Sequence, residues 1–339
     1  MSFYLKNRSL FDLESYEPRD IRYLLDLAAD LKRKKRLGNE RQHLSGKNIA
    51  VVYEQIATRV RCAFEVAVRD QGGEVSYIDL AVNPLAYKES LADKARWLER
   101  LYDGIEYCGF EQSDVEAIAG FSHVPVWNGM TSELHPTQVL ADLMTMEESG
   151  ETPLHLMSFC YLGDARGIAC PLLVGGVQMG MDVRIAGPVE MHPPAELVAR
   201  MRVLAKRTGA RISIETDAKK AVEGVDFIYT NVWVTKSEHE QLGDNNWKAV
   251  WKRRIEQLFP YQVRPDLMLA SGNPRTKFMH GLPAIHNTET EMGRAIYEHF
   301  GLREMSVTEE VFESAASIVF TQAENRMHAI KAALVATLG

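Results

Sequence analysis

The sequence predicts an α/β fold built from two parallel-sheet domains, and three observations support this prediction. The chain has 339 residues, enough for two domains with separate hydrophobic cores. Short apolar segments alternate with helical segments in both halves, which is typical of βαβ units. A turn-forming stretch, Gly150-Glu151-Thr152-Pro153, lies between the two alternations. We therefore expect a first domain over 1–149 and a second domain beginning at 150.

In the first half, an amphipathic helix is predicted from Asp20 to Leu37, because its leucines and Ile21 recur at helical spacing. After it, apolar β-type segments alternate with helical ones. The predicted strands are 48–53, 74–78 and 104–107, and the predicted helices are 58–70, 91–101 and a long helix after His135.

The second half repeats this alternation. Pro171 is expected near the first turn of a helix, where its missing N–H costs little. Segment 236–262 is polar and irregular, and we interpret it as a loop leading into a helix. The predicted strands are 155–162, 182–186, 211–215 and 226–231, with a further strand in 267–270 or 277–280, and the predicted helices are 171–181, 196–208 and 314–338.

The composition is ordinary for a globular enzyme, with 46% hydrophobic and 25% charged residues. The 39 basic and 46 acidic residues give a net charge of −7, which provides no electrostatic reason to expect nucleic acid or an anionic membrane as partner. No apolar run reaches transmembrane length. The four cysteines lack paired spacing, so we expect reduced thiols in a cytoplasmic protein without a zinc site.

The most informative segment is 54–67, which combines a strand end, a polar turn and the start of a helix. A helix N-terminus presents unpaired N–H groups and the positive end of the helix dipole, and therefore favours anions. Arg59 adds a planar guanidinium that suits phosphate or carboxylate. An ordinary surface helix with a capped N-terminus and solvated arginines would have the same sequence pattern. Spacing alone therefore does not distinguish such a helix from an anion-binding site.

Three further segments favour the functional interpretation: His135-Pro136-Thr137-Gln138, His280-Gly281-Leu282-Pro283-Ala284 and Glu324-Asn325-Arg326-Met327-His328. With the first segment, they resemble the ornithine and aspartate transcarbamylase family, and the ornithine branch more closely. The resemblance runs from about Phe11 to the C-terminus. It implies two α/β domains bridged by two helices, a homotrimer with shared sites, and chemistry without metal or cofactor. It also implies that helix 314–339 returns to the first domain, which leaves 150–313 for the second.

The resemblance assigns the donor side of the site. Arg59, Thr58 and His135 would face the carbonyl oxygen of carbamoyl phosphate, and Gln138 would face its nitrogen. The remaining contacts would come from Arg326 and from the backbone near Gly281 and Leu282. Arg59, His135, Gln138 and Arg326 are thus the expected catalytic residues.

The phosphate end departs from the family pattern. The family reads Ser-Thr-Arg-Thr-Arg where this chain has Ala57-Thr58-Arg59-Val60-Arg61, so two hydroxyl donors are missing. Cys108 replaces an expected arginine, and Pro84 replaces a usual glutamine. Each lost hydrogen bond to a charged group costs roughly 1.5–3 kcal/mol, so binding of a dianion should be weaker. Val60 and Cys108 remain in the expected donor site, whereas Arg61 is expected to form a structural buried pair.

The amine end is also altered. Ile168 stands where an amide would bind the substrate carboxylate, and Asn231 replaces an aspartate that would pair with its ammonium group. Lys236 suggests a carboxylate or other acidic group on the ligand. A lysine that is simply solvated in a loop is an equally good interpretation. The expected acceptor-binding residues are Ile168, Asn231, Thr235, Lys236, His280 and Gly281.

Three functions are compatible with these patterns. The first is a diverged carbamoyltransferase of amino acid or specialised metabolism, which modifies a small amine or amino acid other than ornithine. The second is an enzyme that no longer uses carbamoyl phosphate and acts on a ureido, guanidino or amide compound. The third is a non-catalytic relative that binds a metabolite.

Overall fold

The computed structural model describes residues 5–55, 57–80, 89–235 and 247–339. Contacts divide the chain into unit 1, which comprises Met1–Met144 and Glu324–Gly339, and unit 2, which comprises Thr145–Ala323. The chain passes between the units inside two helices, α6 (Pro136–Ser149) and α15 (Val319–Leu338). The division therefore falls within helices and not at the turn 150–153.

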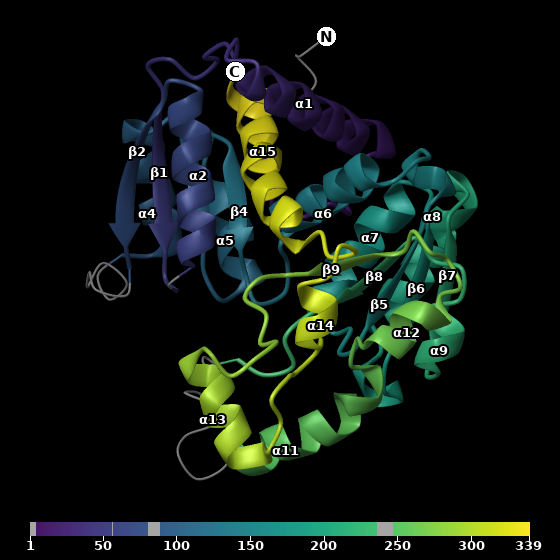
Figure 1. The fold of residues 1–339 in the computed structure, drawn as a ribbon. Helices are drawn as coiled ribbons and strands as arrows, with labels where there is room; N and C mark the ends of the chain where they lie inside the picture. Colours follow the sequence, from purple (N-terminus) through teal and green to yellow (C-terminus); the bar gives the residue numbers. More distant parts are fainter. Residues whose placement is uncertain (1–4, 56, 81–88, 236–246) are drawn as a thin grey trace. The chain divides into compact units, whose positions relative to one another are not determined.

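Unit 1 contains a parallel four-stranded sheet in the order β2-β1-β3-β4. Helix α2 covers one face, and α4 and α5 cover the other (Figure 1). The strands are β1 (Asn48–Tyr53), β2 (Glu74–Asp79), β3 (Gly104–Cys108) and β4 (Val126–Met130), and the other helices are α1 (Pro18–Arg36), α2 (Thr58–Asp70), α4 (Leu91–Leu101) and α5 (Gln112–Phe121).

Unit 2 contains a parallel five-stranded sheet in the order β7-β6-β5-β8-β9. Its strands are β5 (Ser158–Leu162), β6 (Asp182–Ala186), β7 (Arg211–Glu215), β8 (Phe227–Thr230) and β9 (Lys277–His280). Its α-helices are α7 (Ala169–Gln178), α8 (Ala195–Thr208), α9 (Ala218–Ala221), α11 (Trp247–Leu258), α12 (Pro265–Ala270), α13 (Glu291–Phe300) and α14 (Glu309–Phe312). The described part of unit 2 also contains short 3₁₀ helices at Leu154–Leu156, Val189–Met191 and Phe259–Tyr261. The predicted α/β class with two parallel sheets is confirmed.

Several predicted elements were wrong in detail. The strand expected over 155–162 is a 3₁₀ turn followed by β5, because His155 and Leu156 are exposed and lie outside the sheet. Segment 267–270 belongs to α12, which begins at Pro265, a residue that favours the first position of a helix. The helix expected from 314 begins at Val319.

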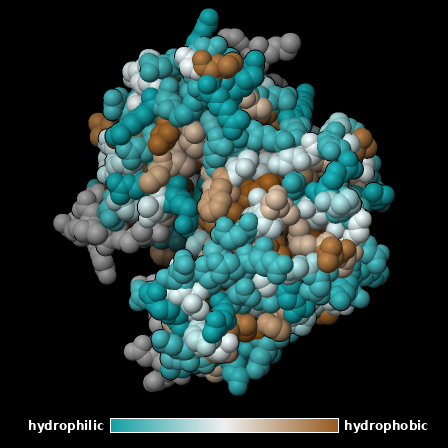
Figure 2. Space-filling model, in the orientation of Figure 1, coloured by the Kyte–Doolittle hydropathy of each residue, from teal (hydrophilic) through white to brown (hydrophobic). Residues whose placement is uncertain are grey.

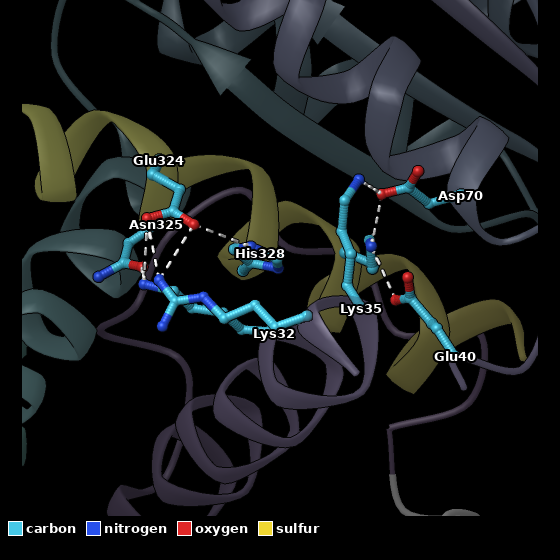
Figure 3. Close-up of polar contacts among 9 residues, drawn as sticks. Lys32, Lys35, Glu40, Asp70, Glu324, Asn325 and His328 are labelled. Carbon is cyan, nitrogen blue, oxygen red and sulfur yellow. Dashed lines mark hydrogen bonds and ion pairs between the residues drawn. The ribbon is translucent and has the colours of Figure 1, made fainter. Parts of the chain in front are cut away.

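Buried charges hold α15 against α1 and α2 (Figure 3). The ammonium group of Lys331 is fully buried and lies 2.7 Å from both Glu40 Oε1 and Asp70 Oδ2. Nearer the start of α15, Lys32 Nζ donates to Asn325 Oδ1 at 2.5 Å and lies 3.4 Å from Glu324 Oε2. These contacts lie on both sides of Arg326 in the sequence, so they fix the helix that carries this guanidinium.

Hydrophilic residues cover most of the face shown in Figure 2. Within the described ranges, no helix is both long enough and apolar enough to cross a membrane. Over the same ranges, no group of three His, Cys, Asp or Glu side chains is arranged to hold a metal ion. All four cysteines are free thiols, and Cys62 alone is exposed.

Candidate active site

Helix α2 starts five residues after β1 ends, at the carboxyl edge of the unit 1 sheet. Its N-cap is Ala57, whose side chain cannot accept a hydrogen bond from the first turn. The N–H groups of Thr58, Arg59 and Val60 have no intrahelical acceptors by helix geometry and are available to an anion. Arg59 is exposed by surface area, although partial burial lowers its pKa, and it remains a cation. This helix start therefore keeps its capacity for anions without the two missing hydroxyl groups.

Arg326 and His135 form the centre of the unit 1 site. Arg326 Nη2 lies 2.6 Å from His135 Nε2 and 3.4 Å from the carbonyl oxygen of Gly129. A guanidinium only donates, so Nε2 must accept and the imidazole proton belongs on Nδ1. Burial, reinforced by the Arg326 charge, holds the pKa of His135 well below its ordinary value, so the ring is neutral. Arg326 remains charged, because burial lowers its pKa only to about 10.

The side chain of Gln138 is oriented by a neighbour on the same helix. Gln138 is buried in α6, and its Nε2 donates to Asp142 Oδ1 at 2.7 Å, one helical turn further on. The amide oxygen is therefore turned away from Asp142 and can accept a hydrogen bond. Asp142 also acts on the Arg326 charge, which places the amide and the guanidinium in one electrostatic environment. This arrangement suits recognition of an NH2 group.

Glu106 is a buried carboxyl group in the middle of β3. It has no exposed surface, and neither of its oxygens has a hydrogen-bond partner among the described residues. A Cβ atom on Gly129 would overlap Glu106 Oε1, so the glycine is required for the carboxyl to lie where it does. Burial raises the pKa of Glu106 to about 8, against the opposing effect of Arg326. The group is mostly uncharged at neutral pH.

A cavity of about 430 Å³ lies between the first turns of α2 and the sheet face beneath them. In the parallel register Tyr53 is paired with Cys108, and Val51 with Glu106, so these side chains leave the same face of the sheet. All four line the cavity, together with Thr58 and Val60 of α2. Burial raises the pKa of the Cys108 thiol, which is therefore neutral.

Arg61 behaves differently from the expected buried pair. Its side chain is exposed, and its guanidinium lies 3.8 Å from the centroid of the Tyr77 ring. The expectation of burial was wrong, because the α2 turn directs this position along the surface beside β2. The cation–π contact with Tyr77 supports a structural role for Arg61.

In unit 2, Asn231 and Gly281 are neighbours after the ends of β8 and β9. A Cβ atom on Gly281 would lie 3.3 Å from Asn231 Oδ1, which is tight for any larger side chain. Strands end here at the carboxyl edge of the sheet, where ligands bind in open α/β folds. The structure therefore brings these two predicted acceptor residues together.

His280 is buried, and both of its ring nitrogens are engaged inside unit 2. Nδ1 lies 2.7 Å from the carbonyl oxygen of Gly281, and Nε2 lies 3.0 Å from Ser306 Oγ. Burial lowers the pKa of His280 to about 4, so the ring is neutral. These contacts support a structural role that fixes the turn after β9, and acceptor binding by this side chain stays a prediction.

Two other predicted acceptor-binding residues occupy separate places in unit 2. Ile168 precedes α7 and is partly exposed, and Thr235 is exposed. Leu282, a predicted donor-binding residue, packs against the apolar core of unit 2. Lys236 and Pro84 lie outside the described residues.

The sequence interpretation did not single out Glu106, Asp142 or Gly129. A charged residue at the centre of the buried strand Gly104–Cys108 was a usable signal for Glu106. The spacing of four residues between Gln138 and Asp142 was a signal for their contact on one helix face.

Comparison with known proteins identifies the two halves. Residues 8–148 match the carbamoyl-P binding domain of aspartate/ornithine carbamoyltransferase, and residues 156–337 match the Asp/Orn binding domain of the same family. The chain belongs to the aspartate/ornithine carbamoyltransferase family. It is therefore a carbamoyltransferase-family enzyme, and its resemblance to this family is confirmed.

The similar proteins cover the whole chain of this carbamoyltransferase. Catabolic ornithine carbamoyltransferases of Rhizobium meliloti and Pseudomonas putida are each 52% identical over 341 residues, spanning 100% of this chain and 100% and 99% of the relatives. The structure of an ornithine carbamoyltransferase from Pyrococcus furiosus is 32% identical, with a TM-score of 0.87 over 99% of this chain and 98% of that chain.

Proposed function

We propose that this carbamoyltransferase transfers the carbamoyl group of carbamoyl phosphate to the amino group of a small acceptor. The observation that carries this proposal is the pair of oriented groups in unit 1. Neutral His135 is held in one tautomer by Arg326, and the Gln138 amide is held in one orientation by Asp142. The His135–Arg326 pair presents a hydrogen-bond donor, the N–H on His135 Nδ1. The Gln138–Asp142 pair presents an acceptor, Gln138 Oε1.

These groups match the two ends of a carbamoyl unit. The N–H on His135 Nδ1 can donate to the carbonyl oxygen, and Gln138 Oε1 can accept from the carbamoyl nitrogen. In the reaction, the acceptor nitrogen bonds to the carbonyl carbon, the bond from that carbon to the phosphate oxygen breaks, and the amine loses a proton. Fixed donors that stabilise charge on the carbonyl oxygen usually provide the largest part of the rate enhancement. The start of α2 and Arg59 would hold the departing phosphate.

For the acceptor, we propose a small amine or amino acid that differs from ornithine in its polar contacts. The relatives are named ornithine carbamoyltransferases, which makes ornithine the reference acceptor. Asn231 can accept a hydrogen bond from an ammonium group but offers no charge, and the side chain of Ile168 offers no hydrogen bond. A site with these two residues should favour an acceptor with fewer charges.

The test combines donor binding with turnover. Calorimetric titration with carbamoyl phosphate, with inorganic phosphate as control, measures the donor site directly. Phosphate release is then followed with ornithine, its shorter and longer homologues, and simple diamines. Turnover with another amine exceeding turnover with ornithine supports the proposal. If ornithine is used efficiently, the proposed difference in the acceptor is wrong. If none of the amines in the panel causes phosphate release, the proposed carbamoyl transfer is wrong.

A second candidate function is favoured by Glu106 and its apolar surroundings. An uncharged carboxyl group beside Val60 and Cys108 provides little for a phosphate dianion. An enzyme of this family that acts on a ureido, guanidino or amide compound would use the same His135 and Gln138 contacts. Turnover of such a compound without a phosphorylated donor would favour this candidate over the first.

The family resemblance also leads us to propose a homotrimer located in the cytoplasm. Light scattering of the purified protein measures the assembly directly. A molar mass near three times the 38.2 kDa of the chain supports the trimer, and a monomer would contradict it.

A further inference from the structure

Strand β9 lies at the edge of the unit 2 sheet, and its outer side pairs with a short stretch of chain that precedes α15. Phe278 N donates to Ala316 O at 2.8 Å, and Ile318 N donates to Phe278 O at 3.0 Å. This is the parallel pattern, in which one residue bonds to the two neighbours of its partner, here Ser317. At Val319 the chain enters α15, so this backbone pairing ends there.

The side chain of Gln322 takes the next position along this edge. The next N–H of β9 on the same side belongs to His280, two residues after Phe278, and it donates to Gln322 Oε1 at 3.1 Å. The other end of the amide, Nε2, donates to the hydroxyl oxygen of Tyr229 in β8 at 2.9 Å. Gln322 and Tyr229 are both buried, so these contacts are shielded from water. One side chain therefore joins the ends of β8 and β9.

We propose that Gln322 is a positioning residue for acceptor binding, which acts by fixing the turn after β9. The inference rests on the proposed carbamoyl transfer and deepens it by naming a group that shapes the acceptor end of the site. A Cβ atom on Gly281, the first residue of that turn, would lie 3.3 Å from Asn231 Oδ1 and 3.7 Å from the Tyr229 hydroxyl oxygen. Gln322 thus holds the groups around Asn231 in place without being an acceptor contact itself.

The turn requires such an anchor because Gly281 has no side chain to hold it and glycine has the widest backbone freedom. The His280 ring secures the turn from within unit 2, with Nδ1 2.7 Å from Gly281 O and Nε2 3.0 Å from Ser306 Oγ. The backbone N–H of His280 is the further point of attachment. Without Gln322 Oε1 this buried donor would lose its acceptor, and an unsatisfied buried donor favours any rearrangement that lets it find a new one.

A positioning role has a kinetic signature that a purely structural role lacks. A turn that is displaced by about one ångström weakens the contacts made at that end of the site. Loss of the Gln322 contacts should therefore raise KM for the acceptor, with little change in kcat. A residue needed only for stability would reduce the amount of folded enzyme, which lowers the apparent kcat and leaves KM unchanged.

Two substitutions test the hydrogen bonds themselves. Gln322→Met is similar in length, suits a helix and removes both contacts. Gln322→Glu keeps both, because a carboxyl group can accept from the His280 N–H and share a hydrogen with the Tyr229 hydroxyl. Amide hydrogen exchange should show that His280 loses protection in Gln322→Met and keeps it in Gln322→Glu, whereas Phe278 stays protected in both. Unchanged protection of His280 in folded Gln322→Met would overturn the proposal.

Steady-state kinetics of the full-length protein at saturating carbamoyl phosphate tests the effect on the acceptor. The probes are ornithine, its shorter and longer homologues and simple diamines. For each amine that the wild type converts, Gln322→Met should raise KM roughly 5- to 20-fold, and Gln322→Glu should restore KM to within about twofold of the wild type. A wild-type KM in Gln322→Met, or a KM that Gln322→Glu does not restore, would overturn the proposal.

Gln178→Met is the matched control. Gln178 is 3% exposed and Gln322 is 1% exposed, and both belong to unit 2, but Gln178 ends α7 shortly before β6 begins, at the opposite edge of the sheet from Asn231. Gln178→Met should leave the acceptor KM unchanged, and an equal rise in both variants would overturn the proposal. If Gln322→Met does not fold, Tyr229→Phe removes only the hydroxyl that accepts from Gln322. It should raise KM roughly 2- to 5-fold, and an unchanged KM would overturn the proposal.

The kinetic results separate failure of this inference from failure of the proposed function. If the wild type converts none of the amines, the proposed carbamoyl transfer is wrong, and the acceptor role of Gln322 is wrong with it. If the wild type converts an amine and Gln322→Met has the same KM, only the inference about Gln322 is wrong.

Discussion

Arg326 Nη2 lies 2.6 Å from His135 Nε2, so a buried cation fixes the tautomer of a neutral histidine. These residues are 191 positions apart in the sequence, and both belong to unit 1. The contact leaves the proton on Nδ1, where it is available to a ligand oxygen.

The first prediction concerns His135. His135→Ala should lower kcat for carbamoyl transfer by roughly 10²–10³-fold, because a fixed donor to the carbonyl oxygen is lost. His123→Ala is the matched control, since the His123 side chain is 91% exposed and its ring pairs with Glu99. Steady-state kinetics of both variants checks this, and equal kcat values would contradict a role for His135 in catalysis.

The second prediction concerns the orientation of Gln138. Asp142→Asn can present an NH2 group to Gln138, which permits the amide to turn and offer its own NH2 to the carbamoyl nitrogen. We expect a 10- to 100-fold higher dissociation constant for carbamoyl phosphate, as for a lost hydrogen bond to a buried group. Calorimetric titration measures this constant. Asp26→Asn, on the exposed surface of α1, should leave it unchanged.

The third prediction is a pH dependence of stability from His280. Its pKa is about 4 in the folded protein and about 6.5 when unfolded, so the unfolded state binds the proton more readily. The associated stability is complete above pH 6.5 and is lost as the pH falls towards 4. Between pH 7.5 and pH 5 the loss should be about 2 kcal/mol.

Urea unfolding of the wild type and His280→Gln at these two pH values isolates this contribution. The decrease in unfolding free energy on acidification should be smaller in His280→Gln by about the same 2 kcal/mol. An identical decrease in both proteins would show that other groups cause the acid sensitivity.

The fourth prediction compares two lysines that pair with Asp70. Lys331→Met should destabilise the protein by about 3–5 kcal/mol, because it leaves Glu40 and Asp70 without their buried partner. Lys35 pairs with the same aspartate from an exposed position, so Lys35→Met should cost less than about 1 kcal/mol. Chemical denaturation measures the unfolding free energy of both variants. Equal decreases in the two variants would contradict this prediction.

The sequence predicted the two parallel sheets because strands and helices alternate with strong local signals. Strand Asn48–Tyr53 and helix Thr58–Asp70 agree with their predicted limits, since apolar spacing and a turn define both ends. Leu267–Ala270 was misinterpreted as a possible strand, because four apolar residues cannot distinguish a strand from a short helix. Helix α5 was missed because its sequence carries little amphipathic contrast.

The site was predicted only as far as its motifs extend. Arg59, His135, Gln138 and Arg326 were named from the sequence, and the described contacts place His135, Gln138 and Arg326 in one environment with Arg59 nearby. The partners that orient them were not foreseeable, because the Gln138–Asp142 contact depends on rotamers. The lack of a hydrogen-bond partner for Glu106 among the described residues depends on its three-dimensional surroundings, which a local sequence pattern does not predict.

The last helix gives the chain a fixed order of assembly. Residues 324–338 of α15 belong to unit 1, yet they follow the whole of unit 2 in the sequence. During synthesis the ribosome therefore delivers the sheet of unit 1 long before the segment that supplies Arg326 and Lys331. Until that segment arrives, Asp70 and His135 face no cation from it, so a nascent chain cannot acquire a complete catalytic centre before unit 2 has been made.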